Sequence, residues 1–408
     1  MNEGSMRPTD LALAYLAAAV VVASVAAATA LIGIIVDWGS STWAAIHLVL
    51  LGGVSLLILG VSQFFVTAFL ATSPPSRRMV AVQITCWTAG AACVVTGVST
   101  DADWLATIGV VLLLTTLLLY ARSLAGLHSR SLQRAPWASR WYAASALWLV
   151  LGIAVGLMLT VHFAWSHGSL LGAHLAFNLG GWLGGAIVGT LHTFAPSLTQ
   201  TRLRFPRLQP ATFAFWSAGC GVTAIGYAFS LGALVLLGWS LLVVGAGLLA
   251  TNLIASGSES KVPLTLPARL VIWSQAFLPL GLLFGLVSAA DHSLAPLFGD
   301  DRVTLAVLLL AGWVGLTVIG SMLHLLSVVV RVRDLGRPAT TPNQLQDRLL
   351  ASAAVGAIGL LAVAEAVTGD RLVGLASFLV LLVAVILVGL VIRSVVAALL
   401  LGPPGRHG

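Results

Sequence analysis

The chain has 408 residues, of which 59% are hydrophobic and 8% are charged. Soluble domains carry about 25% charged residues, so this composition excludes an ordinary water-soluble protein and indicates an integral membrane protein. Its formal charge of +7 is interpreted as a topology signal and an attraction to anionic lipid, which gives no reason to expect nucleic acid as a partner.

Twelve apolar segments are long enough to cross a hydrocarbon core about 30 Å thick, which takes about 20 helical residues. In chain order they cover residues 11–36, 43–70, 79–99, 104–121, 141–163, 169–198, 211–230, 232–255, 267–290, 303–330, 349–367 and 372–398. The sequence therefore predicts an all-α, multi-pass protein of the cell membrane with about 12 transmembrane helices, short connections and the lipid bilayer as a partner. Pro279 is expected to kink the ninth helix.

The basic residues predict the orientation of the chain. With the N-terminus in the cytoplasm, 18 of the 20 Lys and Arg residues lie on the cytoplasmic side, and only Arg302 and Arg371 lie outside. Basic residues are strongly enriched on the cytoplasmic side of membrane proteins. We therefore expect both termini in the cytoplasm.

Pairs of glycines recur in the second, sixth and tenth predicted helices. The pairs are Gly52 and Gly60, Gly181 and Gly189, and Gly312 and Gly320, and their first members are 129 and 131 residues apart. Close helix packing favours small residues, but it does not explain a regular period with matching tryptophans. The period predicts a single membrane domain made of three pseudo-repeated four-helix quartets, at about 1–130, 131–262 and 263–408. Two six-helix halves, common in secondary transporters, are the alternative.

The sixth predicted helix carries the pattern H-x-x-x-N-x-x-G-W-x-G-x-x-x-x-G-T-L-x-x-x-x-P from His174 to Pro196. With His47 in the second helix and twelve helices in quartets, the chain resembles divergent members of the haem-copper oxidase subunit I superfamily. These include the membrane portion of actinobacterial multicopper-oxidase and nitrite-reductase-like proteins. Length and helix number also resemble the NnrS family, whose members contain haem and copper and are linked to nitric oxide.

The resemblance implies a membrane-embedded redox protein that binds haem, copper or both. It also implies nitrogen-oxide, copper or electron-transfer chemistry, with an extracytoplasmic copper or haem protein as partner. Oxygen-reducing members carry histidines around the outer end of the seventh helix and in the tenth. The segments "ATFAFWSAGCGVTAIGYAF" and "VTLAVLLLAGW" contain none here, so the standard oxygen-reducing centre is not expected.

Five of the nine histidines fall near the predicted outer face. They are His47, His162, His167, His174 and His292. Neutral imidazole is a good ligand for haem iron and copper, so all five are candidate metal ligands, although loop histidines such as His162, His167 and His292 are more often merely solvated. His47 and His174 are the strongest candidates for metal ligands. A polar side chain inside the membrane costs free energy, so such side chains usually have a function. Asn178, one turn after His174, is a candidate cofactor contact.

Three further titratable residues have no assigned role. His192 and His324 are predicted toward the cytoplasmic side and Glu365 within the eleventh helix; each could serve a proton path or have a structural function. Two other classes stay open, a proton-coupled secondary transporter and a scaffold subunit that lost its cofactors. A threefold axis along the membrane normal favours the redox protein, and a twofold relation between halves favours the transporter. The residues leave open whether the protein is an enzyme.

Overall fold

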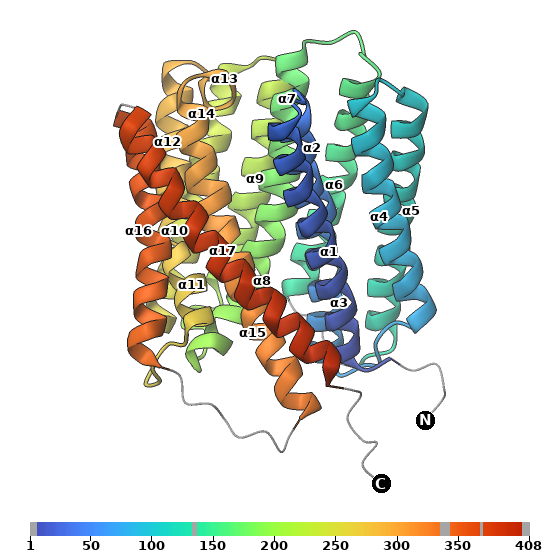
Figure 1. Cartoon of the computed structure of the whole chain (residues 1–408), viewed down its shortest axis with the longest axis vertical. Coiled ribbons are helices and arrows are strands. Elements are labelled where there is room, and N and C mark those ends of the chain that lie inside the picture. The colour runs from blue at the N-terminus through green and yellow to red at the C-terminus, as the bar shows by residue number, and fades with distance from the viewer. Residues whose placement is uncertain (1–5, 133–136, 335–342, 368–369, 402–408) are drawn as a thin grey trace. The chain divides into compact units, whose positions relative to one another are not determined.

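The computed structural model describes residues 6–132, 137–334, 343–367 and 370–401. All regular structure in these ranges is helical, and they contain no strand (Figure 1). Eleven helical segments are long and apolar enough to cross a membrane. The helix α9 (Leu208–Ala228, 21 residues) is not one of these eleven, although its length of about 31 Å, at 1.5 Å per residue, is that of a membrane-crossing helix. The predicted all-α membrane fold is confirmed.

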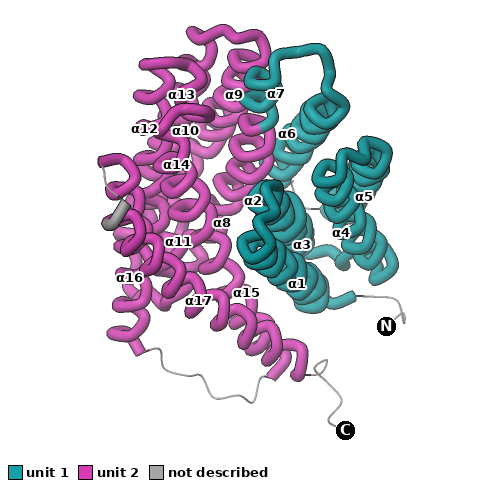
Figure 2. The backbone as a smooth tube through the Cα atoms, turned by 45° about the horizontal axis from the view of Figure 1, so that its top comes forward, with its two compact units in different colours: residues 1–174 teal, residues 175–408 magenta. Residues whose placement is uncertain are grey.

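The chain forms two compact units, residues 1–174 and 175–408, which Figure 2 shows in teal and magenta. The helices up to the boundary are α1 (Pro8–Ile35), α2 (Ser41–His47), η1 (Leu48–Val54), α3 (Ser55–Phe69), α4 (Arg77–Ser99), α5 (Asp103–Ser129), α6 (Trp137–Thr160) and α7 (His167–Leu175). The boundary lies inside one continuous membrane-length helix, His167–Thr199. The limits predicted for the three quartets lie between helices and stay a prediction.

The second unit contains the rest of that helix and the helices that follow it. They are η2 (Ala176–Gly184), α8 (Gly185–Thr199), α9, α10 (Gly232–Gly257), α11 (Leu266–Ser274), α12 (Phe277–Asp291), α13 (Ala295–Phe298), α14 (Asp301–Ala306), η3 (Val307–Gly315), α15 (Leu316–Arg333), α16 (Gln344–Val367) and α17 (Asp370–Leu400). The ninth predicted helix is present as α11 and α12, which are separated at Gln275 and Ala276. Pro279, one turn after Gln275, has no N–H to offer the Gln275 carbonyl, which explains the break.

Three membrane-length helices contain a π-helical segment in the middle. These segments, η1, η2 and η3, begin 128 and 131 residues apart and contain the glycines Gly52, Gly181 and Gly312. A π-helix is rare and is frequent at functional sites. The three π-helical segments recur with the same period as the glycine pairs. The limits of the three quartets stay a prediction.

Two tryptophans make the same contact with these π-helices. Trp87 Nε1 donates a hydrogen bond of 2.8 Å to the Leu51 carbonyl of η1. Trp216 Nε1 donates one of 3.0 Å to the Gly180 carbonyl of η2. The two donors are 129 residues apart, and so are the two acceptors. The same indole-to-carbonyl hydrogen bond therefore occurs in η1 and in η2.

In two of the three pairs, the first glycine lets its helix pack closely on an earlier helix. A Cβ atom added to Gly52 would lie 2.6 Å from Cγ1 of Val22 in α1. One added to Gly312 would lie 2.6 Å from Cγ of Phe277 in α12. Both distances are too short for a side chain, so glycine is required for this close packing.

Candidate metal centre

Two of the predicted ligands meet inside the first unit. His47 ends α2 directly before η1, and His174 lies two residues before η2. The centroids of the two imidazole rings are 6.5 Å apart, and the ring planes are inclined by 30°. Both residues are partly buried. Two histidines that are 127 residues apart in the sequence are therefore neighbours in the fold.

A backbone carbonyl holds one nitrogen of each ring. His47 Nδ1 lies 2.9 Å from the Trp43 carbonyl, one turn earlier in α2. His174 Nδ1 lies 3.0 Å from the Gly152 carbonyl of α6. Since a carbonyl oxygen can only accept, Nδ1 carries the proton in both rings, and in the neutral ring the lone pair is on Nε2. Metal-bound histidines have the same arrangement.

The neighbours of each ring fix its position further. The Trp43 ring packs on His47 with centroids 4.1 Å apart. On the other side of the pair, a Cβ atom added to Gly156 would lie 3.0 Å from Cε1 and 3.2 Å from Nδ1 of His174. The His174 ring therefore lies in a notch on α6, where Gly152 supplies the carbonyl and Gly156 supplies the space.

The two rings supply nitrogen donors that suit a transition metal. Imidazole nitrogens bind such metals at about 2.0–2.1 Å. Histidine nitrogen suits both haem iron and copper. The donor type and the tautomer of His47 and His174 suit haem iron or a copper ion, and the two rings are near neighbours whose planes are inclined by 30°.

The other candidate histidines are exposed, and Asn178 is partly buried one turn after His174. His162 and His167 are exposed, the former in the turn after α6 with a positive φ of 50°. His292 is exposed in the second unit, and its Nδ1 accepts a hydrogen bond from the Leu294 N–H in its own turn. Asn178 is partly buried in η2 of the second unit. Within the described ranges, no group of three or more His, Cys, Asp or Glu side chains could hold a metal ion. The structure thus brings together two of the five predicted ligands.

The residues left without a role lie in the second unit. His192 is buried in α8, with Nδ1 2.8 Å from the Val188 carbonyl. His324 packs edge-on against Phe194, with ring centroids 5.4 Å apart. Glu365 is partly buried in α16. These contacts are compatible with a structural role for the two histidines, and neither is part of the His47–His174 pair.

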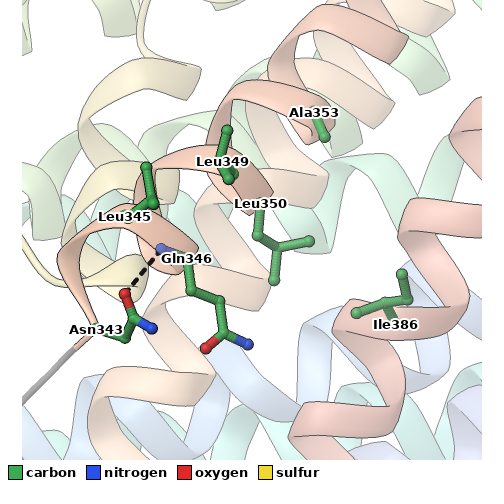
Figure 3. Close-up of a pocket in the computed structure, with 7 residues that line it drawn as sticks. All are labelled: Asn343, Leu345, Gln346, Leu349, Leu350, Ala353 and Ile386. Carbon is green, nitrogen blue, oxygen red and sulfur yellow. Dashed lines mark hydrogen bonds between the residues drawn. The ribbon is translucent and has the colours of Figure 1, made fainter.

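The second unit also has a groove of about 540 Å³ between α16 and α17. In Figure 1, α17 crosses obliquely away from α16, and Figure 3 shows the side chains between them. The lining residues are Asn343, Leu345, Gln346, Leu349, Leu350, Ala353 and Ile386. None of them is titratable, and Asn343 Oδ1 accepts from the Gln346 N–H to cap α16. This groove is therefore not a candidate for metal chemistry.

No protein-family model matches this chain, and neither does any curated protein sequence. The oxidase-like resemblance thus depends on the residues of the chain itself, and a functional proposal depends on the geometry of the His47–His174 pair.

Sequence reasoning identified both histidines but missed the residues that position them. Trp43 was recognisable only as an aromatic residue near the membrane boundary. Gly152 and Gly156 are spaced by one helical turn, which is a signal for close approach of another group. The sequence does not say that His174 is that group.

Proposed function

We propose that the protein is a membrane-embedded redox protein that holds haem iron or a copper ion between His47 and His174. The observation that carries this proposal is the pair itself, with centroids 6.5 Å apart and each Nδ1 beside a backbone carbonyl. When bound, either group would supply one-electron transfer. The proposal does not include oxygen reduction at the standard centre, because the additional histidines of that centre are missing.

The protein's own residues prepare the pair for a metal. The Trp43 and Gly152 carbonyls fix the rings and select the tautomer with its lone pair on Nε2, which makes the imidazole a better ligand. Partial burial limits the access of water, which is a strong competitor for metal ions. In the predicted topology the pair lies toward the outer face, so the proposed electron partner is an extracytoplasmic copper or haem protein. Nitrogen-oxide or copper chemistry is the proposed context.

A secondary transporter is the alternative, and one observation favours it. Gln63 and Gln83 are both 0% exposed in the first unit, and buried polar side chains at membrane depth often mark the path of a transported solute. A transporter would not need His47 and His174 to retain a metal through purification.

Alanine variants test the proposal. His47→Ala and His174→Ala should each lose most of the haem or copper that the wild type binds, measured by visible absorption and metal analysis. His128→Ala is the matched control, because His128 is also partly buried in a helix, with Nδ1 2.7 Å from the Leu124 carbonyl one turn earlier. It should retain the metal. Equal metal content in all three variants would reject the site, provided that each variant is folded by circular dichroism.

A further inference from the structure

Polar side chains from four helices form a buried hydrogen-bond network in the first unit. Tyr15 of α1 donates from its hydroxyl to Gln83 Oε1 of α4 at 2.6 Å. Gln63 Nε2 of α3 lies 3.0 Å from the same oxygen and 3.2 Å from the Tyr15 hydroxyl. Gln83 Nε2 then donates to Ser123 Oγ of α5 at 3.1 Å. All four side chains are buried.

The network leaves two oxygen atoms on α3 without a partner. Gln63 Oε1 and Thr67 Oγ1 are buried, and neither has a hydrogen-bond partner among the described residues. Gln63 is 0% exposed and Thr67 is 1% exposed. Residues four apart share one face of a helix, so these side chains follow one another along α3. A buried polar atom without a partner is costly, and in proteins such atoms are usually satisfied by ordered water.

The hydrogen bonding of the Thr67 hydroxyl supports the same conclusion. Threonines in α5 turn their hydroxyls back to their own helix, as Thr115 does to the Val111 carbonyl at 2.7 Å and Thr116 to the Leu112 carbonyl at 3.0 Å. Thr67 makes no such bond. Its hydroxyl is therefore available to a group other than its own helix backbone.

We infer that Gln63 Oε1 and Thr67 Oγ1 form a binding site for an ordered water molecule. Water is the ligand that fits, because Gln63 Oε1 can only accept a hydrogen bond and a hydroxyl can either donate or accept. A metal cation fits poorly, since the two atoms are neutral oxygens and hard cations take six or more oxygen ligands. Thr67 is two residues from the end of α3, so the site lies toward that end of the helix.

The water would complete the network that joins α1, α3, α4 and α5. In a membrane these helices gain little from the hydrophobic effect between them, so hydrogen bonds contribute to their association. This role is independent of the proposed metal centre.

Water-edited solid-state NMR on the full chain in lipid bilayers tests the inference, with ¹⁵N-labelled glutamine. We expect magnetisation to pass from water to the Gln63 side-chain amide, whose signal is identified by its loss in Gln63→Leu. Gln275 is the internal control, because its amide is satisfied within the protein by Val271, Ser274, Thr317 and Trp313. The transfer to Gln63 should exceed that to Gln275.

Thr67→Val keeps the shape of the side chain and removes its hydroxyl. It should abolish the transfer to Gln63, whereas Thr116→Val, which removes a hydroxyl bonded within its own helix, should leave the transfer unchanged. The Gln275 signal and the thermal midpoint report whether each variant is folded. No transfer to Gln63 in the wild type, or an unchanged transfer in Thr67→Val, would overturn the inference.

Discussion

Gly156 provides the space that the His174 ring occupies beside α6. A methyl group at this position would lie 3.0 Å from Cε1 of the ring, so the ring must shift by a few tenths of an ångström. Disturbing the groups that orient a metal ligand weakens binding about 10- to 100-fold. We expect Gly156→Ala to weaken haem or copper binding by about 10-fold without unfolding the protein, as measured by titration of the metal-depleted protein.

Gly126→Ala is the control for that substitution. A Cβ atom at Gly126, in α5, would meet nothing within 4 Å, and alanine is the better helix former. This variant should bind metal as the wild type does. If Gly156→Ala binds metal as tightly as Gly126→Ala, the notch in α6 does not position His174.

At the scale of single residues, part of the candidate centre could be predicted from sequence. His47 and His174 were identifiable because both are polar residues at the same predicted membrane depth. Their separation was not, since it depends on how α2, α6 and α7 pack. His162 and His167 share that predicted depth, but His162 lies in the turn after α6, His167 begins α7, and both are exposed. Depth alone therefore does not distinguish a ligand from a solvated side chain.

The π-helices depend on hydrogen bonds from neighbouring helices. Trp87→Phe would leave the Leu51 carbonyl without its indole donor, and Trp216→Phe would do the same to the Gly180 carbonyl. A buried hydrogen bond contributes about 0.5–1.5 kcal/mol, so the loss of the indole donor in each variant should lower the thermal midpoint, and by similar amounts. Differential scanning fluorimetry in detergent measures this.

Trp104→Phe serves as the control, because Trp104 is 69% exposed and should tolerate the change. A thermal midpoint that falls no further in Trp87→Phe and Trp216→Phe than in Trp104→Phe would show that these contacts do not stabilise the π-helices.

At the scale of elements, apolar length predicted where the helices lie but not their internal geometry. A π-turn adds about one residue to a helical turn, a change that leaves hydropathy and amphipathic pattern almost unaltered. The break between α11 and α12 was partly visible, since Pro279 predicted a distortion of the ninth helix. Its position at Gln275 follows from the missing N–H one turn later. The glycine period was the signal that coincided with η1, η2 and η3.

At the scale of the whole molecule, the distribution of basic residues predicts which ends of the helices face the cytoplasm. Native Cys86, Cys93 and Cys220 are replaced first, and single cysteines are then introduced at the exposed positions Thr100 and Asp300. A membrane-impermeant maleimide should label both in intact cells, because the positive-inside rule places them outside. Ser258→Cys, in the loop after α10, should react only after permeabilisation. The opposite pattern would invert the topology.

The most direct measurement of the central claim is the amount of haem and copper bound per chain. Wild-type protein is purified gently from cells supplied with iron, a haem precursor and copper, and its haem and metal contents are measured. The proposed site predicts one haem or one copper ion per chain, because His47 and His174 are proposed to bind the same metal atom. Folded wild-type protein that contains neither would contradict the claim and leave the transporter or the cofactor-free scaffold.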